Sequence, residues 1–369
     1  MLQFSAFAQP RGPFTNSPQV HEDKTVTFEY LAPNAEKVTL SGQFINGDPV
    51  EMTKGDQGIW RVTVGPISPD IYPYSFKVDG VTVMDPGNVN YFPNERFKGS
   101  ILLVPGDEPR VYEMKNVPHG SVNYEYYPSI EGSTGSLVVY TPPGYDTSPD
   151  KSYPVFYLIS GTTDTEETFY KVGNVNWILD NLIAEGLAEP MIVVMPYGNT
   201  AARIAEQNGD VKPEDPPRDS DASKTRMKQI ENDLIKQIIP YVDSSYRTIK
   251  NRESRAIAGF SRGGGQTLRI AYGNMDTFAW VCSYAASASP KDMDTDFSSI
   301  AANPDLTNKQ LKLNWVSVGN SDFMYPSTFE YMNYLNEHNI KFQSLITSGG
   351  HTWMNVKKFM TESVQLLFK

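Results

Sequence analysis

The sequence has little cysteine, an excess of acidic over basic charge, and no long apolar run. Cys282 is the only cysteine among 369 residues, so no disulfide can form within the chain. It lies in the apolar run 279–284, where we expect it to be buried rather than reactive. No apolar stretch approaches the roughly 20 residues of a membrane-spanning helix. The net charge of -11 and the lack of a basic cluster argue against nucleic acid as a partner.

Cofactor and metal motifs are also missing. The chain has four histidines, no cluster of metal-ligating residues, no P-loop and no dinucleotide-binding fingerprint, so we expect neither a cofactor nor a metal. The hydrophobic fraction of 39% and the charged fraction of 20% are typical of a globular protein. At 369 residues the chain exceeds one average domain and favours two.

The amino terminus carries a possible processing signal. Positions 6–8 read Ala-Phe-Ala, which matches the A-x-A pattern of a signal-peptide cleavage site. We interpret residues 1–8 as the remnant of a signal peptide from which the charged region and most of the apolar stretch are missing. This interpretation predicts a secreted or periplasmic protein.

The pattern of apolar residues changes along the chain. Residues 20–105 contain short alternating stretches separated by Gly, Pro, Asn and Asp, which predicts a small all-β, immunoglobulin-like sandwich. Residues 106–120 are polar and proline-containing, as in a linker. Over residues 121–369, strand-like and helix-like segments alternate, which predicts an α/β fold. The long polar segment 199–224 is either a lid over the active site or a disordered excursion.

The most informative motif is the G-F-S-R-G of residues 259–263, which matches G-x-S-x-G. Residues 255–258 before it suit a buried strand, and residues 263–271 can begin a helix. A serine at the tip of a tight turn between strand and helix is the nucleophile elbow of α/β-hydrolases. The alternative is a structural glycine-rich turn, but this context favours Ser261 as a catalytic nucleophile.

A serine nucleophile needs a base, and the hydrolase order is serine, acid, histidine. Two histidines follow Ser261. His351 lies in a glycine-rich loop after the apolar residues 342–346, where a base at the carboxyl end of a late strand would reach the elbow. His338 lies at the polar end of a predicted helix, and we interpret it as a solvated helix-end residue. His351 is therefore the predicted base.

The acid should lie between the serine and the histidine. Asp322 follows the strand-like residues 314–318 and would accept a hydrogen bond from the imidazole of His351. Four other aspartates in the interval occupy a polar segment with no strand before it, which we interpret as a surface excursion: Asp292, Asp294, Asp296 and Asp305.

An oxyanion hole requires two N–H donors. The backbone N–H of Arg262, directly after the serine, is the first candidate. The second is Thr162, in the loop after the strand-like residues 153–159, for which a plain surface turn is the alternative. Trp353, two residues after His351, is expected either to bind substrate in the acyl pocket or to fill the core.

Several segments, taken in order, resemble the esterase-D-type hydrolases, which include the feruloyl and acetyl xylan esterases of carbohydrate esterase family 1. They are YTPPGY at 140–145, DNLIAEG at 180–186, PMIVVMP at 190–196, RAIAGFS at 255–261 and GGHTW at 349–353. The resemblance spans about residue 117 to the end. It implies an α/β-hydrolase fold whose triad falls on Ser261, Asp322 and His351. Ser160 and Gly161 stand where these enzymes have His-Gly.

The first domain is similar to family 48 carbohydrate-binding modules. The segments FEYLAPNA at 28–35, VTLSGQF at 38–44 and GIW at 58–60 carry this likeness. Such modules precede esterase domains in bacterial enzymes that degrade arabinoxylan. The tryptophan that these modules use as a glycan platform is absent from residues 44–48, so we do not expect starch-type binding there, and a structural module is the alternative.

The resemblance implies a serine esterase that hydrolyses feruloyl (hydroxycinnamoyl) esters on plant xylan or arabinoxylan through an acyl-enzyme. The expected partner is a plant cell-wall polysaccharide or a feruloylated oligosaccharide. An acetyl xylan esterase or a siderophore-type esterase is the alternative, because the elbow does not distinguish acyl groups. A glycan-binding protein on a silent hydrolase scaffold is the non-catalytic alternative, and the three filled triad positions argue against it.

Overall fold

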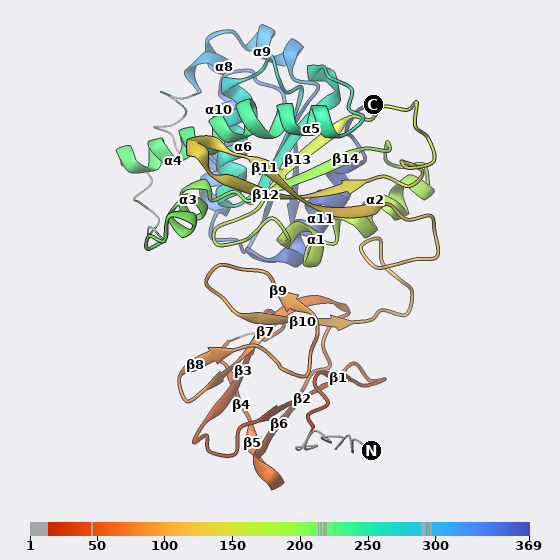
Figure 1. Ribbon diagram of the computed structural model, residues 1–369, viewed down its shortest axis with the longest axis vertical. Coiled ribbons are helices and arrows are strands. Elements are labelled where there is room, and N and C mark those ends of the chain that lie inside the picture. The colour runs from red at the N-terminus through yellow and green to blue at the C-terminus, as the bar shows by residue number, and fades with distance from the viewer. Residues whose placement is uncertain are drawn as a thin grey trace, which may run out of the picture. The chain divides into compact units, whose positions relative to one another are not determined.

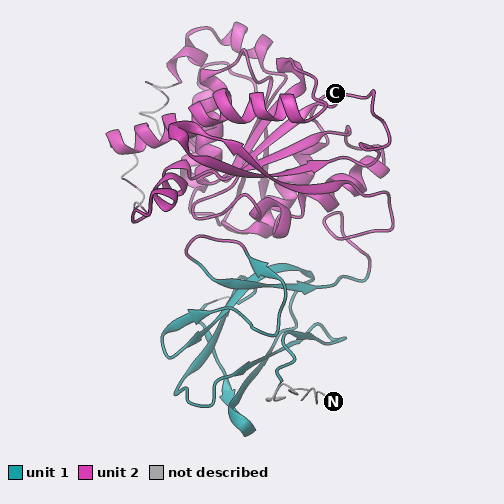
Figure 2. Ribbon diagram, in the orientation of Figure 1, with its two compact units in different colours: residues 1–92, 97–107 teal, residues 93–96, 108–369 magenta. Residues whose placement is uncertain are grey.

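The computed structural model describes residues 14–369 except residues 46, 213, 215, 217–219, 289–292, 294 and 296. The predicted signal-peptide remnant, residues 1–8, and Asp292, Asp294 and Asp296 lie outside the described residues. The chain divides into two compact units (Figure 2), Met1–Phe92 with Phe97–Asp107, and Pro93–Arg96 with Glu108–Lys369. Most of the segment interpreted as a linker, from residue 108 to residue 120, thus groups with the second unit.

The first unit is built from two antiparallel sheets, as expected of the predicted all-β domain (Figure 1). The first sheet has the order β1-β2-β6-β5, with β1 Gln19–Val20, β2 Val26–Leu31, β5 Thr53–Lys54 and β6 Ile59–Val64. The second has the order β4-β3-β7-β10-β9, with β3 Val38–Gly42, β4 Val50–Glu51, β7 Asp70–Val78, β9 Tyr91–Phe92 and β10 Gly99–Val104, and β8 Val81–Val83 pairs with β7. Phe28 and Phe76 are fully buried, and Phe28 packs edge-on against Tyr74 at 5.0 Å between ring centroids.

The second unit is organised around one eight-stranded sheet with the order β11-β12-β14-β13-β15-β16-β17-β18. The strands are β11 Ser121–Pro128, β12 Thr134–Thr141, β13 Val155–Ile159, β14 Ile192–Pro196, β15 Arg255–Phe260, β16 Trp280–Tyr284, β17 Leu313–Gly319 and β18 Gln343–Thr347. The first two strands pair antiparallel, and the strands from β14 to β18 are parallel. Every residue of β13, β14, β16 and β17 is buried, because helices cover both faces of a parallel sheet. The predicted α/β-hydrolase fold is confirmed.

Helices lie on both faces of this sheet in Figure 1, with α5, α6 and α10 on one face and α2 and α11 on the other. The helices are α1 Thr168–Lys171, α2 Val175–Ala184, α3 Thr200–Asn208, α4 Asp221–Asp233, α5 Ile239–Ser245, α6 Arg262–Gly273, α8 Ser298–Ala302, α9 Pro304–Gln310, α10 Tyr325–Glu337 and α11 Trp353–Val364. Short turns of other helical types are η1 Asp56–Gly58, η2 Ile130–Gly132, η3 Leu234–Ile238 and η4 Arg252–Ser254. The π-helical η3 lies between α4 and α5 and leads into Pro240, which lacks the N–H of an α-helical hydrogen bond.

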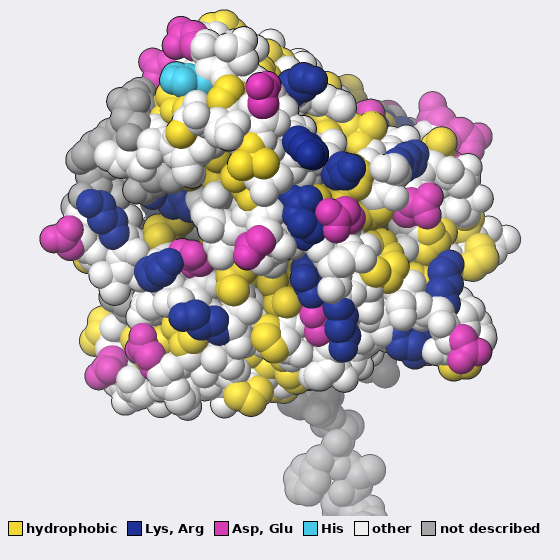
Figure 3. Space-filling view, turned by 90° about the horizontal axis from the view of Figure 1, so that it is seen from above, with side chains coloured by type: hydrophobic (Ala, Val, Ile, Leu, Met, Phe, Trp, Pro, Cys, Tyr) yellow, Lys and Arg dark blue, Asp and Glu magenta, His cyan; other side chains and the backbone are white. Residues whose placement is uncertain are grey.

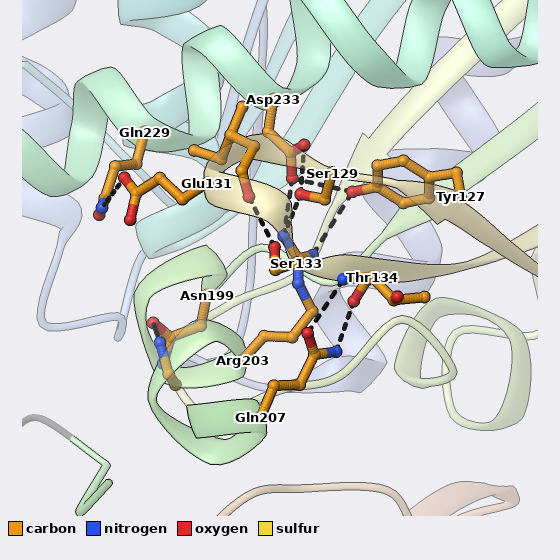
Figure 4. A network of polar contacts seen from close by, with 12 residues as sticks. Tyr127, Ser129, Glu131, Ser133, Thr134, Asn199, Arg203, Gln207, Gln229 and Asp233 are labelled. Carbon is orange, nitrogen blue, oxygen red and sulfur yellow. Dashed lines mark hydrogen bonds and ion pairs between the residues drawn. The ribbon is translucent and has the colours of Figure 1, made fainter. Parts of the chain in front are cut away.

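Part of the long polar segment 199–224 is the helix α3, and a buried ion pair holds it. Figure 4 shows Arg203 of α3 meeting Asp233 at the end of α4, with 3.0 Å between Nη2 and Oδ2. Ser129 and Tyr127 donate hydrogen bonds to the same carboxylate at 2.6 and 2.8 Å. Arg203 is 5% exposed and Asp233 is 0% exposed. In the described part of this segment, residues 200–208 are therefore a fixed helix rather than a disordered excursion.

The surface of the second unit is of mixed charge where Figure 3 shows it. On that face, which lies at the end of the unit where α8 and α9 are found, basic and acidic side chains are interspersed with apolar ones. Among the helices that the structure describes, none has both the length and the hydropathy to cross a membrane. Cys282 is fully buried in β16, as expected, and burial raises the pKa of its thiol.

Candidate active site

Ser261 sits at the tip of a strained turn between β15 and α6. Its φ of 55° and ψ of -118° are unusual for a residue with a side chain, because positive φ brings Cβ against the backbone. The flanking glycines are required by close packing. A Cβ on Gly259 would lie 2.3 Å from the carbonyl group of Gly263, and one on Gly263 would lie 2.2 Å from the carbonyl oxygen of Ile159. The sequence therefore forms an elbow that exposes the serine hydroxyl.

The structure brings the three predicted triad residues together, although they lie up to 90 positions apart in the sequence. Oγ of Ser261 is 2.9 Å from Nε2 of His351. On the other side of the ring, Nδ1 is 2.8 Å from Oδ2 and 3.0 Å from Oδ1 of Asp322. These distances allow the hydroxyl to donate to Nε2 while Nδ1–H donates to the carboxylate.

The loops after β17 and β18 hold the acid and the histidine in place. Asp322 is 4% exposed and also accepts the N–H of Met324 at 2.8 Å. Asn355, a buried residue of α11 that no sequence motif marks, donates to the carbonyl of Ser348 at 2.9 Å and to Oγ1 of Thr347 at 2.8 Å. The histidine loop is thereby tied to the helix that follows it.

Two aromatic rings flank the imidazole of His351. The ring of Phe260, the residue before the nucleophile, lies 4.7 Å from it between centroids, and the ring of Phe323 lies 4.4 Å from it. Phe260 is 6% exposed, whereas Phe323 is 71% exposed. The sequence pattern indicated neither ring, because Phe260 occupies the variable position of G-x-S-x-G and Phe323 resembles any loop phenylalanine.

The two predicted oxyanion donors line the same pocket as the nucleophile. Arg262 is the first residue of α6, where backbone N–H groups have no acceptor within the helix. Thr162 lies in the loop after β13, and both residues line the same pocket. The Arg262 guanidinium also donates to the carbonyl of Gly161 at 3.3 Å, which links the elbow to that loop.

A cavity of about 310 Å³ opens beside Ser261. Loop residues after β13, β14, β16 and β17 line it, together with residues of α3, α4 and α6 and with Pro216 between α3 and α4. Of the described residues that line it, three are arginines and none is acidic. The lining residues are Thr162, Gly198, Asn199, Thr200, Ala201, Pro216, Ser223, Arg226, Met227, Ser261, Arg262, Gly265, Gln266, Arg269, Ala286, Ser287, Phe323 and Met324.

Trp353 occupies the core rather than this pocket, which corrects its prediction as a substrate-binding residue. It is 3% exposed, and its indole packs edge-on against Phe169 at 5.0 Å and Phe260 at 5.4 Å. As the first residue of α11, it faces inward between these rings. The core alternative fits its position.

The other acid and base candidates lie elsewhere. His338 follows the last residue of α10, where its Nδ1–H donates to the carbonyl of Tyr334 at 2.9 Å. Asp305 is an exposed residue in the first turn of α9. Neither takes part in the hydrogen bonds of Ser261 or His351.

One buried carboxyl beside the pocket escaped the sequence patterns. Asp164 is 4% exposed, and burial raises the pKa of its carboxyl to about 7. A hydrogen bond from Asn94 at 3.1 Å lowers the pKa and offsets only part of this increase. In the part of the chain that the structure describes, no group of three or more His, Cys, Asp or Glu side chains could hold a metal ion.

The chain matches the models of two known protein families. The model of the family described as "Putative esterase" matches residues 130–357, so the chain belongs to this family of carboxylic ester hydrolases. The model of carbohydrate-binding module 48 (isoamylase N-terminal domain) matches residues 14–92.

Two curated proteins give the relationship more closely. An endo-1,4-beta-xylanase/feruloyl esterase of Xylanibacter ruminicola is 30% identical over 268 residues, which cover 71% of this chain and 35% of that protein. Endo-1,4-beta-xylanase Y of Acetivibrio thermocellus is 26% identical over 317 residues, which cover 78% of this chain and 27% of that protein. The chain therefore spans about a third or less of the length of these relatives.

Solved structures agree with this assignment. A CE1 ferulic acid esterase of the anaerobic fungus Anaeromyces mucronatus superimposes with a TM-score of 0.57 at 21% identity, covering 71% of this chain and 96% of that one. The ferric enterobactin esterase of Salmonella typhimurium gives a TM-score of 0.58 at 15% identity and covers 95% of each chain. At these identities the likeness establishes the fold. Together with the family models, it confirms the resemblance to carbohydrate esterase family 1 with a family 48 module.

Proposed function

We propose that this chain hydrolyses hydroxycinnamoyl esters, chiefly feruloyl esters, of plant xylan. The observation that carries the proposal is the unbroken series of hydrogen bonds from Asp322 through His351 to Ser261, on a strained elbow that faces a pocket. Such an arrangement activates a serine hydroxyl, which is a weak nucleophile by itself.

The proposed reaction has two steps. Oγ of Ser261 attacks the ester carbonyl while Nε2 of His351 takes its proton, and the carbon–oxygen bond to the sugar breaks as the imidazolium returns that proton to the leaving alkoxide. Water then attacks the acyl-enzyme, with His351 again acting first as base and then as acid. The products are the hydroxycinnamic acid, the free sugar hydroxyl and the regenerated serine. Asp322 keeps Nδ1 protonated and stabilises the imidazolium.

The negative charge that develops on the carbonyl oxygen needs donors. The backbone N–H groups of Arg262 and Thr162 are assigned this role, because both residues border the cavity next to Oγ of Ser261. Removing one such donor costs roughly 2.7–4 kcal/mol of transition-state stabilisation in other hydrolases. A fixed donor pair of this kind would be a large part of the rate enhancement.

The size and lining of the pocket favour an aromatic acyl group over an acetyl group. A cavity of about 310 Å³ falls in the range that binds drug-sized molecules and exceeds what an acetyl group fills. Its planar guanidinium groups, on Arg226 and Arg269, suit stacking and hydrogen bonding to phenolic oxygens. The Xylanibacter and Anaeromyces proteins are named for feruloyl or ferulic acid ester hydrolysis, which supports the same acyl class.

The substrate and location follow as parts of the same proposal. A relative that joins xylanase and feruloyl esterase in one name supports feruloylated xylan or its oligosaccharides as the substrate. A match to a carbohydrate-binding module over residues 14–92 supports a polysaccharide partner. The A-x-A pattern at residues 6–8 supports a secreted or periplasmic location.

The test compares the wild-type chain and Ser261→Ala on methyl ferulate, acetylated xylan and a catecholate siderophore ester. We expect hydrolysis of methyl ferulate to be the fastest and to fall by several orders of magnitude in Ser261→Ala. Covalent labelling by a serine-directed phosphonate separates the catalytic from the non-catalytic alternative. Folded wild-type protein that neither labels at Ser261 nor hydrolyses any of the three esters would contradict the proposal.

A further inference from the structure

Residues 93–96, here called the strap, are separated from the rest of their unit in the sequence. They lie between β9 and β10, two strands of the first unit, yet they belong to the second unit (Figure 2). Pro93 and Asn94 are buried. The strap is short and is flanked in the sequence by the first unit, so it belongs to the second unit through the contacts that it makes there. These contacts involve the loop that contains Thr162, the proposed oxyanion donor.

The strap is bonded to the loop after β13 and to the first residue of α1. Asn94 forms an isolated antiparallel bridge with Asp164, and its Nδ2 donates to Oδ1 of that residue at 3.1 Å. The backbone N–H of Glu95 donates to the carbonyl of Thr163 at 2.7 Å. Oγ1 of Thr168 donates to the carbonyl of Pro93 at 2.9 Å.

The residue held by the second of these bonds is strained. Thr163 has a φ of 65°, a conformation that a β-branched residue rarely adopts unless its surroundings enforce it. It is 4% exposed and follows Thr162, whose N–H is the proposed oxyanion donor. The bond from Glu95 therefore holds the peptide group that carries the Thr163 carbonyl, and a single peptide group separates it from the one that carries the N–H of Thr162.

The side chain of Glu95 reaches a second segment that lines the pocket. Its carboxylate accepts the hydroxyl of Tyr197 at 2.5 Å and the amide of Asn199 at 3.1 and 3.3 Å. Asn199 lines the pocket and caps α3, because its Oδ1 accepts the N–H of Ala202 at 3.3 Å. Glu95 thus joins the oxyanion loop to the start of α3 through its backbone on one side and its carboxylate on the other.

We propose that Glu95 is a positioning residue for the esterase reaction: it fixes the distance between the Thr162 loop and the Asn199 wall, so that the oxyanion donor and the acyl pocket keep their places around Ser261. This inference rests on the proposed function. It assigns the strap a role in the rate of the chemical step rather than in glycan binding.

The test is Glu95→Ala in the full chain, with steady-state kinetics on methyl ferulate. Loss of the carboxylate should lower kcat by roughly tenfold to a hundredfold, the effect of a displacement of about 1 Å at a reacting centre, with a KM within about threefold of wild type. Glu95→Gln keeps one acceptor oxygen for Tyr197, but its NH₂ group would face the NH₂ group of Asn199 and could not accept its hydrogen bond. The kcat of Glu95→Gln should therefore lie between those of wild type and Glu95→Ala. Hydrogen exchange should be faster in peptides covering residues 160–166 of Glu95→Ala.

The matched control is Glu125→Ala. Glu125 also accepts hydrogen bonds from tyrosines, from Tyr241 at 2.9 Å and Tyr246 at 2.6 Å, and it does not line the pocket. Its kcat should stay at the wild-type value. Should Glu95→Ala fold poorly, Tyr197→Phe, which removes a single hydroxyl, should lower kcat in the same direction with the melting temperature unchanged.

The outcomes separate this proposal from the esterase proposal. A wild-type kcat in Glu95→Ala, or an equal fall in kcat and melting temperature in Glu95→Ala and Glu125→Ala, would overturn the role of the strap and leave the esterase proposal intact. An inactive wild-type protein whose Ser261 resists phosphonate labelling would overturn the esterase proposal, and the role of Glu95 would fall with it.

Discussion

The ring of Phe323 lies against the imidazole of His351, with 4.4 Å between centroids, while 71% of Phe323 remains exposed. Phe323 also lines the pocket. A large exposed apolar side chain beside a reacting histidine is suited to contact the sugar or the aryl ring of an ester, and aromatic contacts of this kind contribute about 0.5–1.5 kcal/mol.

We therefore expect Phe323→Ala to raise KM for a feruloylated arabinose oligosaccharide by about threefold to tenfold, with a smaller change in kcat. Steady-state kinetics on the purified variant measure this. Phe329→Ala is the control, because Phe329 is 47% exposed on α10 and does not line the pocket. Equal kinetics for Phe323→Ala and wild type would rule out a substrate contact at this ring.

Replacing the acid should disable the histidine without unfolding the protein. In Asp322→Asn the amide can no longer accept from Nδ1–H and stabilise the imidazolium as the carboxylate does, which favours the wrong tautomer of His351. A loss of about 10⁴-fold in kcat follows by comparison with other triad enzymes. The kinetic constants and the circular dichroism spectrum together check this expectation.

Asp305→Asn is the matched control for that substitution, since Asp305 is exposed in α9. It should retain wild-type kinetics. A kcat for Asp322→Asn within a factor of ten of wild type would exclude Asp322 as the acid.

The buried carboxyl of Asp164 predicts how stability varies with pH. Its pKa is raised from 3.8 to about 7 by burial, so between these values the folded chain binds more protons than the unfolded chain. The stability contributed by the neutral carboxyl is complete below pH 3.8 and is lost as the pH rises through about 7. Asp164→Asn removes this titration and should therefore gain stability relative to wild type as the pH increases.

The measurement is urea unfolding at pH 5 and pH 8, followed by tryptophan fluorescence. Four of the five tryptophans lie in the second unit, so the signal reports mainly on it. The difference between Asp164→Asn and wild type should be larger at pH 8 than at pH 5. Asp146→Asn, at an exposed position, should show no such change, and parallel behaviour of Asp164→Asn with wild type would refute a raised pKa.

The buried pair of Arg203 and Asp233 predicts an asymmetry between single and double substitutions. Arg203→Leu leaves an unpaired buried carboxylate and should lower the free energy of unfolding by about 3–5 kcal/mol. The double variant Arg203→Leu/Asp233→Leu removes both charges and should lose less. Urea unfolding of the two variants tests this, and a double variant as unstable as the sum of two single variants would contradict it.

The sequence predicted those parts of the fold that local patterns encode. The buried runs of β13, β15 and β17 and the G-x-S-x-G turn were identified because apolar strands and a glycine-flanked serine are local signals. The strand β11 was not predicted, since it lies at the edge of the sheet and only one of its residues, Tyr127, is buried. An edge strand with exposed Tyr124 and Tyr126 has no apolar run to mark it.

The triad could be predicted because these hydrolases have their catalytic residues in a fixed order along the chain. The order of serine, acid and histidine, with each at the end of a strand, selected Ser261, Asp322 and His351, which the structure brings into hydrogen-bond contact. Glu95 and Asn94 could not be found in this way, because they meet the loop after β13 through contacts between residues far apart in the sequence, such as Asn94 and Asp164, which are 70 positions apart. Trp353 was predicted to bind substrate because it is close to His351 in the sequence. The first residue of a helix can face the core as readily as a pocket, and Trp353 faces the core.

Rapid-quench mass spectrometry of the chain mixed with methyl ferulate tests whether Ser261 forms the acyl-enzyme. We expect a transient feruloyl adduct on the peptide that contains Ser261, absent from Ser261→Ala, that disappears as ferulate is released. An adduct on another residue, or full turnover of methyl ferulate by Ser261→Ala, would contradict it.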